Sequence, residues 1–332
     1  MKGKILVTAR SFQKMEGPHQ EILREAGYEL VGSPLDRPLE AMELEPLLEG
    51  AEAAILGLDA VSRPALEKAE RLKVISRFGV GVDRIDLRAA TDLGIVVTVT
   101  PGANSVAVAE LTIGLIIALA RQIPQHDRQV RAGGWDRAPG SELQGTTLGL
   151  VGLGRIGSEV GRRAAAFGMR ILFTDPAPPS ADLVAGLGAE PRDLNELLAE
   201  SDVVSLHLPL GEATRGIIGA RELGLMKRSA RLVNTSRGGL VDEGALADAL
   251  RAGRLAGAAA DAFESEPPGD NPLLALGNFV ATPHIGSVTV QTTLRMGRMA
   301  AENALAVLSG LRPEHVVNPE VYSRKQLRAA RA

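Results

Sequence analysis

The sequence has no cysteine, few aromatic residues and no excess of either charge. Without cysteine, disulfides, thiolate metal sites and a cysteine nucleophile are excluded. Aromatic residues make up 3% of the chain, and 37 Lys and Arg against 40 Asp and Glu leave a formal net charge of −3. A net charge this close to zero gives no sign of the excess positive charge that binds nucleic acid or an anionic membrane, and neither is an expected partner.

Long apolar runs and a secretory signal are also missing. The longest apolar run, 111–120, falls well short of the roughly 20 residues that a membrane-spanning helix needs. The N-terminus leads within four residues into the strand-like run 5–7, which is not typical of a signal peptide. We therefore expect a cytoplasmic protein.

The residues that are present are typical of an ordinary globular chain of two domains. Its 332 residues are 45% hydrophobic and 23% charged, and the length is about twice that of a usual domain. Short β-branched runs alternate with helical patterns, which predicts parallel sheets covered on both faces. The expected strands are 5–7, 53–56, 73–76, 95–97, 147–151, 170–174, 202–206, 231–235, 257–260 and 278–282. We predict an α/β fold of two doubly wound parallel-sheet domains.

Two helical segments bear on assembly. Segment 103–121 has almost no polar interruption, so it should be buried on most sides, at a domain junction or a subunit interface. We therefore expect at least a dimer. Segment 288–308 follows the last strand and is expected to return to the first domain, and the basic tail 324–332 is expected to fray.

A glycine-rich segment, Gly152-Leu153-Gly154-Arg155-Ile156-Gly157, predicts a dinucleotide site. A strand runs directly into it, a helix with an apolar stripe follows, and the next strand ends in Asp175. Gly152 permits the tight turn, Gly154 allows a pyrophosphate to approach, and Gly157 allows close packing of helix on strand. Asp175 would accept hydrogen bonds from an adenosine ribose and repel a 2′-phosphate, which favours NAD over NADP. The alternative is a purely structural glycine turn.

Candidate catalytic residues follow predicted strands. Among five histidines, His284 stands at the end of strand 278–282, where ligands bind in open α/β sheets. His207 also follows a strand, but its apolar neighbours favour a structural or cofactor-lining role. Arg237, between a strand end and a glycine pair, suits a bidentate carboxylate. An acid from the cluster 261–266 could fix the tautomer of His284 and keep it protonated, and the composition leaves Glu264 and Glu266 both open.

Several separated motifs together carry a family resemblance. They are FGVGVDRIDL (78–87), PGANSVAVAE (101–110), LGLVGLGRIG (148–157), HLPL (207–210), NTSRGGLVDEGAL (234–246), DAFESEP (261–267) and ATPHIG (281–286). In this set and order, the chain resembles the D-isomer-specific 2-hydroxyacid dehydrogenases, closest to the short D-3-phosphoglycerate dehydrogenase group. The resemblance covers roughly residues 4–312. We expect none of the C-terminal regulatory domain, and hence none of the serine feedback, of longer phosphoglycerate dehydrogenases.

The resemblance implies a role for each matching residue. Arg237 binds the substrate carboxylate and carbonyl, His284 is the acid/base, and Glu266 is the acid that pairs with it. Residues implied in substrate binding are Val80, Gly81, Asn104, Arg237 and His284. Residues implied in cofactor binding are Gly152, Gly154, Arg155, Ile156, Gly157, Asp175, His207, Pro209, Thr214, Thr235, Ser236, Asp261 (beside the nicotinamide amide) and Gly286. The implied cofactor is NAD, and no metal is expected.

The resemblance also implies the domain plan and the substrate class. The flavodoxin-like substrate domain comprises 1–100 and 285–320, the Rossmann NAD-binding domain comprises 101–284, and 321–332 is a tail. The chain departs from the family at Arg84, where Asn is frequent, so Arg77 and Arg84 are spare cations near the substrate loop. We expect a homodimer acting on a small 2-hydroxy or 2-oxo acid, first D-3-phosphoglycerate and its 2-oxo form. The alternatives are hydroxypyruvate or glyoxylate, a phosphonate-bearing acid, or an NAD-sensing corepressor-like protein.

Overall fold

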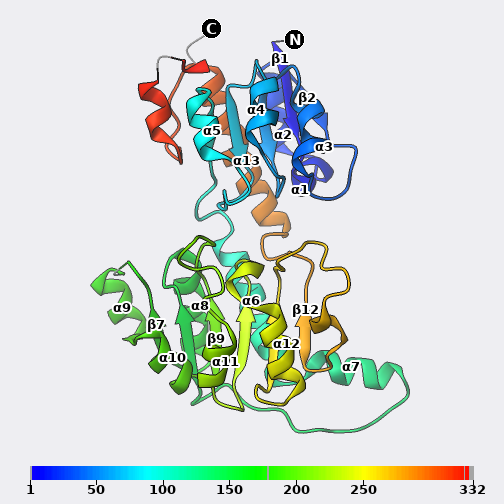
Figure 1. Cartoon of the computed structure of the whole chain (residues 1–332), viewed down its shortest axis with the longest axis vertical. Coiled ribbons are helices and arrows are strands. Elements are labelled where there is room, and N and C mark those ends of the chain that lie inside the picture. The colour runs from blue at the N-terminus through cyan, green and yellow to red at the C-terminus, as the bar shows by residue number, and fades with distance from the viewer. Residues whose placement is uncertain (1, 178, 325, 329–332) are drawn as a thin grey trace. The chain divides into compact units, whose positions relative to one another are not determined.

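The computed structural model describes residues 2–177, 179–324 and 326–328. The chain divides into two compact units (Figure 1). Unit 1 comprises Met1–Asn104 and Val288–Ala332, and unit 2 comprises Ser105–Ser287. Each unit is built on one parallel sheet, of five strands in unit 1 and seven in unit 2. The prediction of an α/β fold with two parallel sheets is confirmed.

The sheet of unit 1 has the strand order β2-β1-β3-β4-β5, with every pair parallel. Its strands are β1 (Gly3–Val7), β2 (Tyr28–Gly32), β3 (Ala51–Leu56), β4 (Val74–Arg77) and β5 (Val96–Thr98). Its helices are α1 (Arg10–Lys14), α2 (Pro18–Glu25), α3 (Ala41–Leu48), α4 (Arg63–Lys68), α5 (Leu87–Asp92), α13 (Val290–Leu308) and the 3₁₀ helix η3 (Pro319–Ser323). The sequence pattern did not predict β2, an edge strand whose residues are only partly buried.

Alternate residues of the unit 1 strands bury two separate cores. Ile5 and Val7 of β1 face a core that includes Met296 of α13, whereas Leu6 of β1 faces a core that includes Leu44 of α3. Because side chains of a strand point alternately to its two faces, this division shows that both faces of the sheet are covered. Helix α13 packs on β3 and β4, within the same unit as the N-terminal strands.

The sheet of unit 2 has the order β12-β11-β10-β9-β6-β7-β8, again all parallel. Its strands are β6 (Thr147–Val151), β7 (Arg170–Thr174), β8 (Glu190–Pro191), β9 (Val203–Leu206), β10 (Arg231–Asn234), β11 (Gly257–Ala260) and β12 (Phe279–Ala281). Its helices are α6 (Ser105–Ala120), α7 (Ile123–Arg131), α8 (Arg155–Ala166), α9 (Ala181–Leu187), α10 (Leu194–Glu200), α11 (Ala220–Leu225), α12 (Glu243–Arg251) and the 3₁₀ helices η1 (Gly238–Leu240) and η2 (Pro272–Ala275). Two cores again lie on opposite faces of the sheet, one with Val151 and one with Leu150 of β6.

Helix α6 owes its apolar sequence to the interior of unit 2. It packs against α8 and against β10, β11 and β12, and ten of its sixteen residues are buried. Much of its burial is thus reached within one unit. Among the described helices, no single one is both long and apolar enough to cross a membrane. Only α6 and α7 taken together, bent by 63°, meet that requirement, and on length and composition alone.

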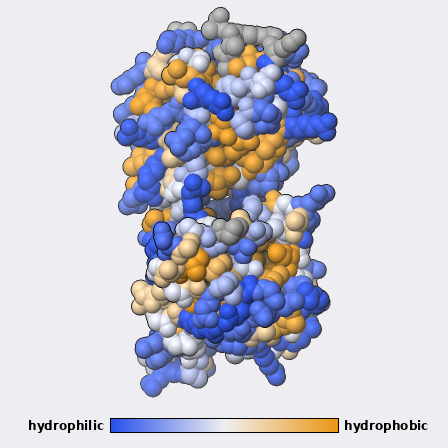
Figure 2. Space-filling view, turned by 90° about the vertical axis from the view of Figure 1, so that its left-hand side faces the viewer, coloured by the Kyte–Doolittle hydropathy of each residue, from blue (hydrophilic) through white to orange (hydrophobic). Residues whose placement is uncertain are grey.

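The visible surface of each unit is mixed in character. In Figure 2 hydrophilic side chains cover much of this face of both units, with apolar areas between them. A mixed surface of this kind is ordinary for a folded chain, because polar groups cannot cover it completely.

Candidate active site

The glycine-rich loop between β6 and α8 has the geometry of a dinucleotide site. Gly152 has φ +103°, and a Cβ there would lie 2.7 Å from the carbonyl oxygen of His207. A Cβ on Gly157 would collide with the carbonyl oxygen of Gly152, so α8 packs closely on the turn. A Cβ on Gly154 would meet open space, and Gly154 caps α8 without a side-chain hydrogen bond. The first turn of α8 therefore presents backbone N–H groups beside free space, which fits the pyrophosphate of NAD.

Asp175, directly after β7, holds this loop in place. Its Oδ2 accepts a hydrogen bond from the backbone N–H of Leu153 (2.7 Å), and its Oδ1 accepts one from Ala177 (2.9 Å). Each carboxylate oxygen has a second lone pair, so the group can still accept a ribose hydroxyl. The segment 176–179 is Pro-Ala-Pro-Pro and supplies no cation for a 2′-phosphate.

His207 follows β9 and borders the same loop. Its Nε2 shares a hydrogen bond with Ser205 Oγ (2.9 Å), while its buried Nδ1 has no hydrogen-bond partner among the described residues. Burial lowers the pKa of His207 to about 3, so the ring is neutral at physiological pH. Farther along this loop, Thr214 Oγ1 donates to the carbonyl oxygen of Pro209 (2.7 Å) and accepts from the N–H of Gly211 (2.8 Å). The predicted cofactor residues here thus lie beyond the carboxyl end of one strand.

The turn after β10 carries Arg237. Asn234 Nδ2 donates to the carbonyl oxygen of Arg237 (2.7 Å), and Asn234 Oδ1 accepts from the N–H of Ser236 (3.0 Å). Ser236 Oγ donates to the carbonyl oxygen of Leu206 (2.7 Å), and the hydroxyl of Thr235 lies 2.8 Å from that of Thr112 in α6. These bonds occupy the turn's own polar groups and fix the backbone from which the half-buried Arg237 side chain extends.

His284 and Glu266 form a close pair. Nδ1 of His284 lies 2.8 Å and 2.9 Å from the two carboxylate oxygens of Glu266. His284 is also one of two described non-glycine residues with positive φ (+53°), a strained conformation that is found preferentially at functional sites. Glu264, the other acid that the composition left open, is exposed, and its Oε1 lies 3.9 Å from Nη1 of Arg215. The structure therefore pairs His284 with Glu266 through Nδ1.

The surroundings keep Glu266 ionised. Burial raises the pKa of Glu266, but four effects outweigh it and leave that pKa below its ordinary value. These are the hydrogen bond from His284, the charge of His284, the N–H of Phe263 (3.1 Å from Oε1) and the charge of Arg237. An ionised carboxylate on Nδ1 fixes the ring orientation and stabilises an imidazolium.

Asp261, which follows β11, holds the loop that carries His284. Its Oδ1 accepts hydrogen bonds from Thr282 Oγ1 (2.5 Å) and the N–H of Ile285 (2.9 Å), and its Oδ2 accepts one from the N–H of Gly286 (2.8 Å). Burial raises the pKa of Asp261, although these bonds and the charge of His284 oppose the rise. The resemblance suggested only a place beside the nicotinamide, and it missed this anchoring of residues 282–286.

In unit 1 the loop after β4 contains two of the substrate residues that the resemblance suggested, Val80 and Gly81. The N–H of Gly79 donates to Thr100 Oγ1 (3.0 Å), and the N–H of Thr100 donates to the carbonyl oxygen of Gly79 (2.9 Å). Buried Arg77 donates through Nε to the carbonyl oxygen of Gly81 (3.0 Å). Val80 lies between these two fixed points with 41% of its surface exposed. Asn104, half-buried, ends the first segment of unit 1.

Both spare cations near this loop have protein partners. Arg77 Nη1 donates to the carbonyl oxygens of Leu56 and Phe78. Arg84 Nη2 lies 2.7 Å from Glu40 Oε1 in an exposed ion pair. Arg77 therefore shapes the loop from inside. Across the described part of the chain, no group of three or more His, Asp or Glu side chains could hold a metal ion.

Comparisons with known proteins agree with this geometry. Residues 113–286 match the model of the NAD-binding domain of D-isomer specific 2-hydroxyacid dehydrogenases. A D-3-phosphoglycerate dehydrogenase of Methanocaldococcus jannaschii is 50% identical over 261 residues, 78% of this chain, which spans about half of that relative's length. A glyoxylate reductase of Aeropyrum pernix is 47% identical over 278 residues, 81% of this chain and 83% of the relative.

A solved structure gives the same answer for the whole fold. The crystal structure of the TT0316 protein of Thermus thermophilus matches with a TM-score of 0.86 and 43% identity, over 95% of this chain and 99% of that one. Relatives with two different names stand at similar identity, so these matches establish the family and leave the substrate open. The chain belongs to the D-isomer specific 2-hydroxyacid dehydrogenase family and is an NAD-dependent oxidoreductase of that family.

Proposed function

We propose that the chain interconverts a short, unphosphorylated 2-oxo acid and its D-2-hydroxy acid, with His284 as the acid/base. The observation that carries the chemistry is the contact of both Glu266 carboxylate oxygens with His284 Nδ1, on a strained residue at the carboxyl end of a parallel strand. This arrangement leaves Nε2 to exchange a proton with a substrate oxygen.

The proton and charge movements in the reducing direction follow from these residues. NADH held by the segment 152–157 would supply the hydride to C2 of the substrate. The protonated ring of His284 donates its Nε2 proton to the 2-oxo oxygen, while Glu266 stabilises the charged ring before transfer. Arg237 binds the substrate carboxylate and polarises the adjacent carbonyl, so negative charge that develops on the oxygen meets a fixed cation. In the oxidising direction the neutral ring takes the proton back.

The cofactor residues are proposed from the same geometry. Backbone N–H groups of the segment 152–157 hold the pyrophosphate, Asp175 accepts the adenosine ribose hydroxyls, and neutral His207 borders the cofactor. The wider proposed set is Arg155, Ile156, Pro209, Thr214, Thr235, Ser236, Asp261 and Gly286. For Asp261 we propose a contact with the nicotinamide amide in addition to its loop bonds, since its Oδ2 accepts only one of them.

Unit 1 is proposed as the substrate domain. Its strand order β2-β1-β3-β4-β5 is the flavodoxin-like order, in which ligands bind at the carboxyl edge of the sheet. The loop after β4 lies at that edge, and we propose that backbone amides at Val80 and Gly81 bind the substrate carboxylate, with Asn104 assisting. Unit 2 is then the NAD-binding domain.

The preference for an unphosphorylated acid rests on charge. Arginine side chains favour the binding of a substrate phosphate, and the two that the sequence offers near this loop are engaged, Arg77 with backbone carbonyls and Arg84 with Glu40. Buried Asp59, after β3, adds negative charge at the same sheet edge and accepts hydrogen bonds from the N–H groups of Leu39 and Gly57. Glyoxylate and hydroxypyruvate carry no second anionic group and fit this environment.

D-3-phosphoglycerate stays the second candidate for one specific reason. The ion pair of Arg84 with Glu40 is exposed, and such pairs are worth roughly 0–1 kcal/mol, so an incoming phosphate could replace Glu40. The test is turnover of glyoxylate, hydroxypyruvate and 3-phosphohydroxypyruvate with NADH, in the wild type and in Arg84→Ala.

Each outcome of this comparison has one meaning. We expect the small acids to be preferred, with little change in Arg84→Ala. A phosphorylated preference that collapses in Arg84→Ala would establish the second candidate. Tight NADH binding without turnover of any 2-oxo acid would favour the NAD-sensing binding protein.

We also propose a homodimer. Helix α7 and the segment after it expose the large apolar residues Ile123 (50%), Val130 (52%) and Trp135 (78%). Because Trp135 is the single tryptophan, quenching of its fluorescence by iodide measures directly whether a second subunit buries its side chain. Sedimentation should give twice the mass of the chain, and replacement of Ile123 and Val130 by Glu should give monomers. A monomeric wild type would refute the proposal.

A further inference from the structure

Glu266 lies on a segment with little regular structure of its own. Residues 262–271 connect β11 to the 3₁₀ helix η2, and several of them, such as Glu264 and Pro267, are exposed. Both carboxylate oxygens nevertheless lie within hydrogen-bond distance of His284 Nδ1, at 2.8 Å and 2.9 Å, which requires the carboxylate to be held in one place. The segment must therefore be fixed from outside.

Glu243, the first residue of α12, supplies that fixation. Its Oε1 accepts a hydrogen bond from the backbone N–H of Glu264 (2.8 Å), and its Oε2 accepts one from Asn271 Nδ2 (2.5 Å). Glu264 and Asn271 lie toward opposite ends of the segment, so one carboxylate ties both ends to one helix. Asn271 is fixed in turn, because its Oδ1 accepts from the N–H of Leu273 (3.0 Å).

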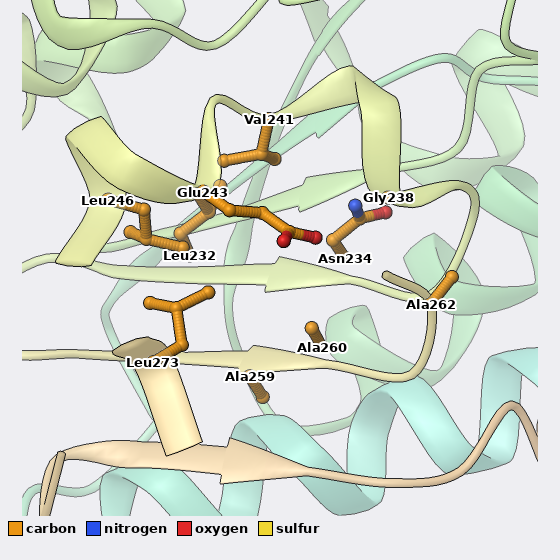
Figure 3. A pocket seen from close by; sticks show the side chains of 10 residues that line it. All are labelled: Leu232, Asn234, Gly238, Val241, Glu243, Leu246, Ala259, Ala260, Ala262 and Leu273. Atoms are coloured by element: carbon orange, nitrogen blue, oxygen red, sulfur yellow. The ribbon is translucent and has the colours of Figure 1, made fainter. Parts of the chain in front are cut away.

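The direction of the Glu243 side chain agrees with this role. Glu243 borders a small cavity of about 10 Å³ lined mostly by apolar residues. Figure 3 shows the carboxylate turned toward the end of the cavity formed by Asn234 and Gly238, away from Leu246 and Leu273. A charged group held beside apolar side chains requires hydrogen-bond partners, and the two donors provide them.

A continuous set of contacts leads from Glu243 to the reacting histidine. The peptide between Phe263 and Glu264 packs so closely on Gly238 that a Cβ there would collide with it. The Phe263 ring packs edge-on against Phe279, with centroids 6.3 Å apart. From this fixed peptide the N–H of Phe263 donates to Glu266 Oε1 (3.1 Å), and Glu266 contacts His284.

Stabilisation of helix α12 does not account for these contacts. An acid in the first turn of a helix interacts with the helix dipole wherever its side chain points. The cap of α12 is already provided by Asp242, whose Oδ1 accepts from the N–H of Ala245 (2.9 Å). Both oxygens of Glu243 instead bind donors outside the helix.

We propose that Glu243 is a positioning residue for the acid/base pair, acting through Glu266. The inference rests on the proposed roles of Glu266 and His284. It predicts that Glu243→Ala lowers kcat/KM by roughly 10- to 100-fold, the effect of a displacement of about 1 Å at a reacting group. The loss lies mainly in kcat, and the dissociation constant of NADH is unchanged.

The decisive measurement is a double-mutant cycle with Glu266→Gln. If Glu243 acts through Glu266, Glu243→Ala has at most about a 3-fold effect in the Glu266→Gln background, because coupled residues are not additive. The matched control is Asp242→Ala, one residue away on the same helix. It removes the cap and lowers Tm, but kcat/KM stays within about 3-fold of wild type.

The acid limb of the pH profile gives a readout that stability alone does not move. The contact with His284 contributes to the low pKa of Glu266, so loosening that contact in Glu243→Ala shifts the acid limb to higher pH, and Asp242→Ala does not. Full additivity in the cycle, or an unmoved acid limb, would overturn the role of Glu243. An unaltered kcat/KM in Glu266→Gln itself would instead overturn the proposed function.

Discussion

Acidification should destabilise unit 2 through His207. The buried Nδ1 of this residue has no hydrogen-bond partner in the described chain, and burial lowers its pKa to about 3. In the unfolded chain the pKa returns to about 6.5. Because the folded pKa is the lower one, the unfolded state binds the proton first. Stability is therefore lost as the pH falls below about 6.5, and this continues down to about pH 3.

The magnitude follows from the difference between the two pKa values. A pH of 5 is about 1.5 units below the pKa of the histidine in the unfolded chain. Each unit is worth about 1.36 kcal/mol, so protonation stabilises the unfolded state by about 2 kcal/mol at this pH. At pH 8 the effect is nearly zero. Part of the His207 residue is exposed, so its folded pKa could be higher than about 3. Any folded pKa below about 4 nevertheless gives almost the same destabilisation at pH 5, because that destabilisation then depends on the pKa in the unfolded state.

The assay is urea unfolding of wild type and His207→Gln at pH 8 and pH 5. The stability difference between the two proteins should move by about 2 kcal/mol in favour of the variant at pH 5, since glutamine does not titrate. Other titrating groups are common to both proteins and cancel. His126→Gln, in helix α7 of the same unit, is the control for loss of any histidine. A difference that stays constant within about 0.5 kcal/mol would show that folded His207 accepts a proton, and would refute the reasoning.

Three further predictions concern the acid/base pair and the cofactor. Arg237→Ala should lower kcat/KM by about 100-fold or more while NADH binds as before, and turnover within a few-fold of wild type would exclude Arg237 as the carbonyl-polarising group. The pKa of Glu266 lies below its ordinary value of 4.5, so its carboxylate stays ionised at a lower pH than that of an ordinary glutamate. The acid limb of kcat/KM should therefore lie below pH 4.5 and vanish in Glu266→Gln. Asp175→Ala should weaken NADH more than NADPH, measured as dissociation constants, and an unchanged ratio would contradict its role at the ribose.

Local sequence patterns predicted the elements whose conformation depends mainly on the residues within them. β-Branched runs predicted most strands, and the glycine spacing predicted a turn whose φ at Gly152 is +103°. Weak elements were missed because their causes are tertiary: β2 is a partly buried edge strand, and β8 has only two residues. A run of apolar residues also predicts burial but does not identify the packing partners. For α6 these partners are α8 and the strands β10, β11 and β12 of its own unit.

Side-chain partners far apart in sequence could not be predicted from composition or spacing. Composition offered Glu264 and Glu266 equally, because nothing local distinguishes two acids on one loop. The family resemblance pointed to Glu266, and the fold brings that carboxylate to His284. Arg77 is an available cation in the sequence, yet in the fold it lies inside its loop and binds carbonyl oxygens. Glu243 gave no signal, since its donors are 21 and 28 residues away.

Three carboxylates in unit 2 solve one physical problem, which is how to fix irregular backbone at the ends of parallel strands. Asp175 holds the glycine-rich loop, Asp261 holds the loop of His284, and Glu243 holds the loop of Glu266, each with backbone N–H groups among its donors. A carboxylate suits this task because it accepts several hydrogen bonds at once, and hydrogen bonds to a charged group are stronger than neutral ones. An amide of the same size has one oxygen in place of two, so it can keep only part of these contacts. Replacing Glu243 by glutamine should therefore lower activity more than cofactor affinity, because its donors hold only the loop of Glu266. The same change at Asp175 or Asp261 should lower both, since these two carboxylates are also proposed to contact the cofactor.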